Sequence, residues 1–383
     1  MYVSDLALTD FRSYEQVLLS LEPGITAFVG PNGQGKTNLV EAIAYLSTFT
    51  SHRVAGDSAL VRAGTPRAIV QAKVMKGTRE VVLEVEIIAG KANRARLNRA
   101  PARPRDLLGH VRTVLFAPED LALVKGDPGG RRRFFDDLLV LFTPRMAGVR
   151  ADYDRVIKQR NALLKTAGAA RRRGANADLA TLDIWDAKAA QAGAELTSAR
   201  VDLLTKLRPY LQESYDVVSG ARGQADAMYS SRLSSDDDEL SEASMMDSSL
   251  VEARLLEAMG RLREREMERG VTLVGPHRDD VDFVLRGLPA RGYASHGESW
   301  SYALALRLAS YELLKDDSWS GGDPILILDD VFAELDTQRR QRLAHMVEGA
   351  QQVLITAAVA EDIPTVLSGG RIDVIDNEVS RVY

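Results

Sequence analysis

Apolar and polar residues alternate along residues 1–30 and again along residues 69–98. A period of two is typical of strands with one buried face, so both stretches predict strands. The first stretch ends in the β-rich run Ile25–Val29, which a glycine follows. From Asn38 to Phe49 the apolar residues instead recur every three or four positions, which predicts a helix. The N-terminal region is therefore expected to be rich in strands, with a strand–turn–helix unit within it.

The middle of the chain has helical spacing. Apolar residues step by three and four from Met146 to Leu163 and again from Leu182 to Leu203, which indicates helices with one buried stripe. Between them, residues 166–178 are rich in Ala, Gly and Arg and are predicted to be a loop. We expect an antiparallel helical hairpin over residues 146–207, with arms roughly 30–45 Å long at 1.5 Å per residue. Two ordinary packed helices would give the same pattern, and this alternative stays open.

The last part of the chain begins with a predicted solvated loop. Residues 230–249 form a run of Ser, Asp and Glu with almost no apolar content, which predicts a flexible acidic loop. After this run the apolar spacing predicts helices and strands in turn. The predicted helices are 250–269, 299–315 and 337–348, and the predicted strands are 271–274, 281–285, 325–328 and 353–355.

The composition is that of an ordinary globular protein and excludes several classes. Lys+Arg number 49 and Asp+Glu 54 among 383 residues, so a uniformly basic nucleic-acid-binding protein is excluded and any such binding must use local basic patches. The absence of cysteine excludes disulfides, thiolate catalysis and cysteine-ligated metal centres. The N-terminus lacks a signal-peptide pattern, and no apolar run approaches the roughly 20 residues that span a bilayer. We therefore expect a cytoplasmic protein.

Residues 30–37 have the sequence of a phosphate-binding loop. The run Gly30-Pro31-Asn32-Gly33-Gln34-Gly35-Lys36-Thr37 matches G-x-x-x-x-G-K-[ST] and lies between a predicted strand and a predicted helix. Glycines let backbone N–H groups converge on a phosphate, and the start of the helix adds the positive end of its dipole. Lys36 is expected to neutralise the β- and γ-phosphates, which makes it a candidate catalytic residue, and the Thr37 hydroxyl is expected to ligate Mg²⁺.

Two acids at the end of a buried strand are the candidate second half of this site. Four apolar residues, Ile325–Leu328, precede Asp329 and Asp330. Asp329 is placed to hold Mg²⁺, and Asp330 is the candidate catalytic base or the group that orients the attacking water. The alternative is a strand that ends in a solvated turn.

The two halves of this candidate site are far apart in the chain. Thr37 and Asp329 are 292 positions apart, whereas a small kinase or a GTPase places its second acid far sooner. Length alone, at roughly 150 residues per domain, suggests two or three domains in a row. The separation instead predicts one nucleotide-binding fold with a large insertion. We expect residues 1–115 and 291–383 to form this head and residues 116–290 to form an inserted, mainly helical lobe.

Several motifs resemble one known family. Residues 331–336, which follow Asp330, are similar to the D-loop of ABC-type ATPases, and Ser295–Glu298 resembles the ABC signature. Residues 11–14 resemble the N-terminal motif of SMC-like heads, and the segments 118–136 and 275–280 resemble stretches of the RecF family. Because the matches run in order along nearly the whole chain, the sequence is identified as a member of the RecF family of SMC-like, ABC-type ATPases.

The resemblance implies an α/β fold: an ABC-type P-loop ATPase head whose inserted, mainly helical second lobe bears a short helical hairpin. It implies ATP and Mg²⁺ as cofactors, an ATP-dependent homodimer, and slow hydrolysis that resets the dimer. It also implies DNA repair at single-strand gaps or single/double-strand junctions, with RecO- and RecR-type mediator proteins that help to load the recombinase, and a link to the SOS response. The corresponding location is the cytoplasm, in association with the nucleoid.

The same resemblance implies roles for further residues. Ser295 and the backbone of Gly297 would cap the γ-phosphate of a second copy, and Asp336 would lie at the same interface. Arg12 and Ser13 would approach the nucleotide of their own subunit. In two places the sequence departs from ABC transporters: Thr356 stands at the position of the switch histidine, and Asp330 replaces a glutamate. The shorter acid predicts slow turnover.

The candidate DNA-binding surface is the stretch 91–105, which carries basic residues and no acid. Such a run suits phosphate contacts without base readout, although a solvated basic face would have the same composition. The candidate residues are Arg94, Arg96, Arg99, Arg103 and Arg105, with a second basic run at 171–173. A structural or nucleotide-proximal role is expected for the run 131–133, because it leads into two phenylalanines.

Two other functions remain compatible with the sequence. One is a transporter or another ABC-type ATPase subunit, which the large insertion and the absent switch histidine disfavour. The other is a nucleotide-locked scaffold that binds ATP and protein partners with negligible hydrolysis.

Overall fold

The computed structural model describes residues 1–173, 180–221, 223–233, 240–317 and 322–382. The chain divides into two compact units, of which the first comprises Met1–Lys125, Pro209–Ala225 and Ala294–Tyr383. The second unit comprises Gly126–Arg208 and Asp226–Tyr293. The segment 209–225, which the sequence analysis assigned to the helical lobe, groups with the head because Tyr215 packs against Tyr302 and the Val218 carbonyl accepts a hydrogen bond from Arg342.

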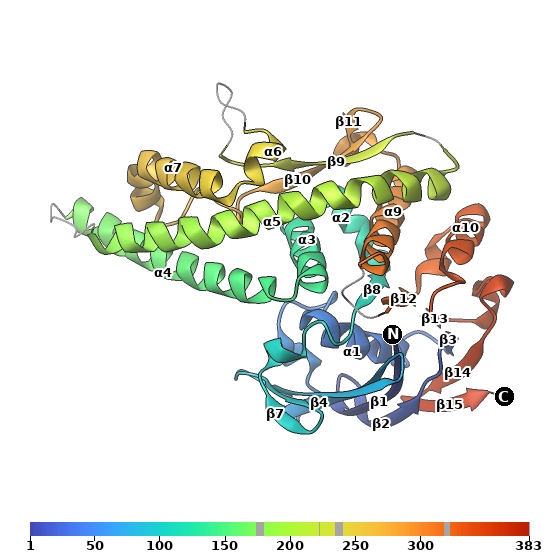
Figure 1. The fold of residues 1–383 in the computed structure, drawn as a ribbon. Coiled ribbons are helices and arrows are strands. Elements are labelled where there is room, and N and C mark those ends of the chain that lie inside the picture. The colour runs from blue at the N-terminus through green and yellow to red at the C-terminus, as the bar shows by residue number, and fades with distance from the viewer. Residues whose placement is uncertain (174–179, 222, 234–239, 318–321, 383) are drawn as a thin grey trace. The chain divides into compact units, whose positions relative to one another are not determined.

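The first unit contains two six-stranded sheets (Figure 1). An antiparallel sheet has the order β2-β1-β4-β5-β6-β7. Its strands are β1 (Tyr2–Phe11), β2 (Tyr14–Ser20), β4 (Arg67–Lys76), β5 (Arg79–Ile88), β6 (Arg94–Leu97) and β7 (Ala100–Ala102). The other sheet has the order β15-β14-β3-β13-β12-β8 and is parallel except for β15. Its strands are β3 (Gly24–Val29), β8 (Thr113–Phe116), β12 (Ile325–Asp329), β13 (Gln352–Ala357), β14 (Gly370–Ile375) and β15 (Glu378–Val382).

Helix α1 (Lys36–Thr48) packs between the two sheets and contacts strands of both. Its residues Leu39, Ile43 and Leu46 recur at helical spacing and are fully buried. The short helix α2 (Leu121–Lys125) packs against α9 (His296–Lys315), and α10 (Thr337–Val347) connects β12 to β13. The strands β12 and β13 that α10 connects are parallel. Every residue of β12 and of β13 is buried. The predicted α/β ATPase head is confirmed.

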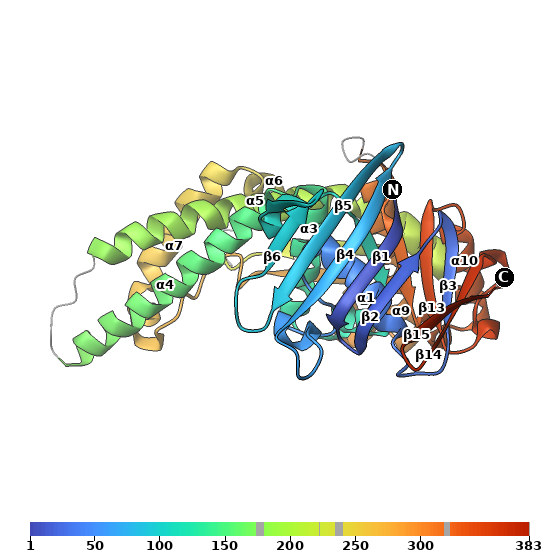
Figure 2. The ribbon, with the colours of Figure 1, turned by 90° about the horizontal axis from the view of Figure 1, so that it is seen from below.

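The second unit is mainly helical. It contains α3 (Pro128–Phe142), α4 (Met146–Arg172), most of α5 (Ala180–Ser219), α6 (Glu242–Met245), α7 (Ser248–Arg269) and α8 (Ala290–Tyr293). A small sheet has the order β11-β10-β9, with β9 (Ala225–Ser230), β10 (Asp280–Leu285) and β11 (Leu288–Pro289). Helices α4 and α5 run antiparallel in both views (Figures 1 and 2), and a buried ion pair of 2.6 Å joins Arg160 to Asp186. The predicted helical hairpin is confirmed.

Three local predictions differ from the structure. The predicted loop 166–178 begins too early, because α4 continues to Arg172 and packs against α7 there, with Leu164 and Met267 in one apolar cluster; residues 174–179 lie outside the described residues. The predicted strand 271–274 is absent, since side chains rather than a neighbouring strand satisfy its backbone: Thr272 N donates to Asn161 and Leu273 N to Glu266. The predicted acidic loop 230–249 contains α6 and the start of α7, and its residues 234–239 lie outside the described residues.

Within the ranges given above, no helix combines the length and the apolar character that crossing a membrane requires.

Candidate nucleotide-binding site

The glycine-rich loop lies where three neighbouring parallel strands end. It follows β3, whose neighbour β13 pairs in turn with β12, and Asp329 is directly opposite Thr356 in this pairing. Open α/β sheets bind ligands beyond the carboxyl ends of their strands. Helix α1 begins at Lys36, so the positive end of its dipole points into the loop. The phosphate-binding loop therefore has the strand–loop–helix setting that its sequence predicted.

Close packing explains two of the loop's glycines. A Cβ atom at Gly30 would lie 2.1 Å from the Val374 carbonyl oxygen, and one at Gly35 would lie 2.8 Å from the Tyr14 hydroxyl. Gly35 also has a φ of 100°, which L side chains rarely adopt. On the outer side, Gln34 accepts a hydrogen bond of 2.5 Å from Asp376 N in the turn between β14 and β15. The C-terminal hairpin thus supports the loop, which no sequence motif indicated.

Lys36 points back into the loop. Its side chain is buried, and Nζ donates to the carbonyl oxygens of Gly30 at 2.7 Å and Pro31 at 3.1 Å. Phosphate oxygens in the loop would offer this ammonium group charged acceptors in place of neutral carbonyls. The residue is therefore placed to bind the negative charge that the loop collects.

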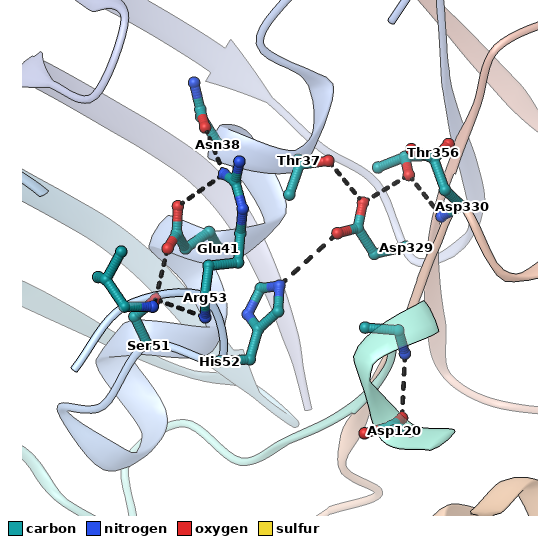
Figure 3. A network of polar contacts seen from close by, with 12 residues as sticks. Thr37, Asn38, Glu41, Ser51, His52, Arg53, Asp120, Asp329, Asp330 and Thr356 are labelled. Carbon is teal, nitrogen blue, oxygen red and sulfur yellow. Dashed lines mark hydrogen bonds and ion pairs between the residues drawn. The ribbon is translucent and has the colours of Figure 1, made fainter. Parts of the chain in front are cut away.

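Residues from opposite ends of the chain bring oxygen atoms together beside the loop (Figure 3). The Thr37 hydroxyl donates to Asp329 Oδ1 at 2.9 Å, and the Thr356 hydroxyl donates to the same oxygen at 2.6 Å. A hydroxyl and a carboxylate are hard oxygen ligands that suit Mg²⁺, which otherwise keeps water and phosphate oxygens as ligands. In the described part of the chain no group of three His, Asp or Glu side chains could hold a metal by itself, so the residues fit a cation that binds together with phosphate.

Asp330 faces a cavity of about 260 Å³ beside the loop, which Asn32, Pro118, Glu334 and Thr356 also line. Its backbone N–H donates to the Thr356 hydroxyl at 2.9 Å. Burial raises the pKa of Asp330, and the neighbouring charge of Asp329 raises it further. This carboxyl group can therefore accept a proton from, or orient, a water molecule in the cavity.

Glu41 organises the residues beside α1, and sequence reasoning missed it. This fully buried carboxylate accepts two bonds from the Arg12 guanidinium, at 2.9 and 2.5 Å, and one of 2.5 Å from Ser51. Ser13 Oγ accepts a bond of 2.8 Å from Asn38 Nδ2, so Arg12 and Ser13 both lie beside the first turns of α1 (Figure 3 shows Glu41, Asn38 and Ser51). The helical spacing in residues 38–49 identifies buried apolar positions only. It therefore did not indicate that Glu41 would also be buried.

His52 is the second missed residue. Its Nε2 lies 3.7 Å from Asp329 Oδ2, on the side of that carboxylate away from Thr356 (Figure 3). The histidines show no metal-ligand spacing in the sequence, so only the fold reveals this contact.

The signature and D-loop residues are helix caps. The Ser295 hydroxyl accepts from Glu298 N, the Glu298 carboxylate accepts from Ser295 N, and α9 consequently begins at His296 rather than near Ser299 as predicted. Asp336 caps α10 in the same way: its carboxylate accepts from Arg339 N at 2.9 Å, and this bond lowers the pKa of Asp336. Backbone N–H groups at the starts of α9 and α10 thus hold the side chains of Ser295, Glu298 and Asp336 in place.

The basic stretch 91–105 contains the strand β6 and the edge strand β7, and acids outside the stretch pair with part of it. Arg94 lies 3.7 Å from Glu86, Arg96 lies 3.0 Å from Glu84, and Arg103 lies 3.1 Å from Asp106. Arg99 lies in the tight turn between β6 and β7, with a φ of 69°. The stretch is therefore less positive than its composition predicts. The second basic run also has a partner, since Arg171 pairs with Glu264.

The family-specific segments of the second unit are structural. Arg131 forms two bonds of 2.8 and 2.7 Å with Asp280, and Arg132 donates to the Asp279 carbonyl. The Asp279 carboxylate is buried and accepts from Tyr229 Oη and Arg232 N. Within the second unit, residues 131–132 of one segment and 279–280 of the other therefore hold each other together.

Comparisons with known proteins agree with this architecture. A family model described as the RecF/RecN/SMC N terminal domain matches residues 2–369. The chain is 62% identical over 396 residues to the DNA replication and repair protein RecF of Beutenbergia cavernae, and the match covers 100% of both chains.

Two solved structures are similar to the whole chain. One is described as the recombination mediator protein RecF with ATP in the RecFOR pathway; it is 26% identical, with a TM-score of 0.88, and the match covers 100% of this chain and 98% of the other. The other is an SMC head bound to the C-winged helix domain of ScpA; it is 17% identical, with a TM-score of 0.55, and the match covers 100% and 97%. This second likeness concerns the fold alone.

Proposed function

The chain belongs to the RecF family of DNA replication and repair proteins, and we propose that it is an ATP-dependent DNA-binding protein that acts at single-strand gaps or single/double-strand junctions in recombinational repair. ATP brings two copies together, and slow hydrolysis resets the dimer. RecO- and RecR-type mediator proteins are the partners with which it helps to load the recombinase, and the repair contributes to the SOS response. Its place of action is the nucleoid.

The observation that carries the proposal is the meeting of Thr37 and Asp329 across 292 positions, next to the cavity that Asp330 lines. The bond that is hydrolysed is a phosphoanhydride bond of the nucleotide. Lys36 and the backbone N–H groups of residues 30–37 hold its phosphates, Thr37 and Asp329 hold Mg²⁺, and Asp330 positions water for attack. Arg12 and Ser13 bind the nucleotide from beside α1.

The positions of the remaining motifs support the proposed dimerisation. Ser295 and Gly297 begin α9 and Asp336 begins α10, so these residues present two positive helix ends to solvent. Such a surface suits the γ-phosphate held by a second copy. An ATP-bound dimer is then favoured because the nucleotide contacts both copies, and hydrolysis removes those contacts. The arginines of residues 94–105 supply phosphate contacts to DNA.

The test measures DNA binding and molecular mass together. Binding of gapped, single-stranded and duplex DNA is compared with and without ATP and Mg²⁺, while light scattering reports the mass. We expect ATP to double the mass and to strengthen binding to the gapped substrate most. The Lys36→Ala variant is the control, and it is expected to lose both effects because the loop can no longer neutralise the phosphates. ATP-independent mass and equal affinity for all three substrates would refute the proposal.

A further inference from the structure

Arg339, in the first turn of α10, contacts both the D-loop and the signature helix. Its Nε donates to the Ser301 hydroxyl on α9 at 2.9 Å, and its Nη1 donates to the Asp336 carboxylate at 2.5 Å. Its backbone N–H binds the same carboxylate at 2.9 Å. Ser301 is almost fully buried, whereas Asp336 is half exposed. One guanidinium group therefore ties the exposed cap of α10 to the buried side of α9.

The same side chain explains the glycine of the signature. A Cβ atom at Gly297 would lie 2.8 Å from Arg339 Nη2 and 3.3 Å from Nη1. The backbone of Gly297 is helical, so its conformation would suit any residue. A larger residue here would force the end of the Arg339 side chain to shift. The signature segment and Arg339 are therefore in close contact.

The electrostatic setting indicates a function beyond packing. Arg339 lies at the N-terminal turns of α9 and α10, where helix dipoles disfavour a cation. Asp336 offsets part of this cost. A cation retained at two positive helix ends is best accounted for by an anion that approaches the same surface, and the triphosphate held by a second copy is such an anion.

We infer that Arg339 is a positioning residue that holds the signature residues Ser295–Glu298 and the D-loop residue Asp336 as one preformed surface for the nucleotide of a second copy. The inference rests on the proposed ATP-dependent dimer. Preformed surfaces bind more tightly because less conformational freedom is lost on association. Without Arg339, the start of α9 and the D-loop would have to be ordered when the two copies meet.

The first test uses the full chain without nucleotide. Hydrogen–deuterium exchange is compared between the wild type, Arg339→Ala and the control Arg342→Ala, an arginine on the same helix that binds the Val218 carbonyl instead. We expect faster exchange in residues 295–301 and 331–336 of Arg339→Ala only. Unchanged exchange there would overturn the inference whether or not the protein dimerises.

The second test follows dimerisation. ATP affinity is measured at protein concentrations too low for dimers, and mass is measured over a protein dilution series with ATP. Arg339→Ala is expected to bind ATP like the wild type and to need about tenfold more protein to dimerise, which is roughly 1.4 kcal/mol. Arg339→Lys, which keeps the charge but not the planar fork, should lie between the two. Dimerisation of Arg339→Ala at the wild-type concentration, or loss of its ATP affinity, would overturn the positioning role.

A third comparison uses Gly297. Because the guanidinium fills the space beside this residue, Gly297→Ala should weaken dimerisation more in the wild type than in Arg339→Ala. Additive effects would contradict the packing argument. A wild type that stays monomeric with ATP would refute the proposed function, and the exchange experiment would still decide whether Arg339 couples the two elements.

Discussion

Asp330 has a left-handed backbone with a φ of 51°, directly after the last residue of β12. For an L-residue other than glycine this conformation costs on the order of 1 kcal/mol and persists where the surroundings demand it. The Thr356 hydroxyl stabilises this conformation, because it accepts a hydrogen bond from Asp330 N and donates one to Asp329. Thr356 thus helps to position both Asp329 and Asp330. In the sequence, this position was notable only because it lacks the switch histidine of ABC transporters.

Asp330→Asn tests the role of this carboxyl group. The amide preserves the size of the side chain and the backbone bond to Thr356 but cannot take up a proton. We expect ATP-dependent dimers to persist while phosphate release falls by about 10²-fold or more, the usual range for losing a general base. Phosphate release and mass are measured in the same sample.

The result also separates an ATPase from a nucleotide-locked scaffold. A scaffold with negligible hydrolysis would show the same low phosphate release in the wild type and in Asp330→Asn. Unchanged release in the variant of an active wild type would contradict the catalytic assignment.

At the scale of elements, the strands β6 and β7 show how a composition is altered by folding. The stretch 91–105 contains no acid, yet β5 contributes Glu84 and Glu86 opposite Arg96 and Arg94. Sheet pairing brings the Cβ atoms of cross-strand neighbours to about 5 Å from each other. The alternate acids of β5 therefore offset the charges of the alternate arginines of β6. The arginines in the turn and after β7 are not opposed in this way.

The DNA-binding prediction can therefore be made specific. In the Arg99→Ala, Arg105→Ala double variant we expect the slope of log affinity against log salt concentration to fall by up to about two, since each lost phosphate contact removes roughly one counterion. The Arg94→Ala, Arg96→Ala double variant should change the slope less, because both residues already have acid partners. Fluorescence anisotropy over a salt series measures both. Equal slopes in all three proteins would put the DNA contacts elsewhere.

Most helices and strands could be predicted from the spacing of apolar residues, because an element that buries one face repeats its apolar residues with its own structural period. The spacing at 38–49 and 250–269 found α1 and α7. The predicted strand 271–274 was wrong because side chains satisfy its backbone groups, one from Asn161, which is distant in sequence, and one from Glu266. The early end predicted for α4 was wrong because contact with α7 stabilises an Ala- and Arg-rich stretch that spacing alone does not mark.

At the scale of the whole molecule, both units bury charged side chains. The first pairs buried Glu41 with Arg12 beside the apolar core between its sheets, and the second buries Arg200 with Asp136 at 2.8 Å. Burial raises the pKa of Asp279 to about 6 and lowers the pKa of His277 to about 4. These two neighbours in the segment 275–280 make the stability of the second unit depend on pH in opposite directions.

The sign follows from proton counting. Between about pH 4 and 6 folded Asp279 keeps a proton that the unfolded chain has lost, so its contribution to stability falls as pH rises. Folded His277 lacks a proton that the unfolded chain holds between about pH 4 and 6.5, so its contribution rises with pH. Each slope is on the order of 1 kcal/mol per pH unit, and the two nearly cancel.

The Asp279→Asn variant should reveal the pH dependence of stability that His277 contributes. We expect this variant to be less stable overall, and its free energy of unfolding to rise more steeply with pH across this window than that of the wild type. His277→Gln should show the opposite slope. Urea unfolding at several pH values across the window measures all three proteins, and parallel curves would contradict the burial of these groups.

The sequence by itself determined the phosphate-binding loop, the strand with its two acids, the helical lobe and the family, because each depends on residues close together in the chain or on the order of motifs. The tertiary structure alone decided which distant groups complete them. Thr356 and His52 lie at Asp329, Glu41 holds Arg12, and Arg339 joins the D-loop to the signature. A local pattern indicates which face of an element is buried. Which residues become partners depends instead on which elements meet across the core, and only the folded chain determines this.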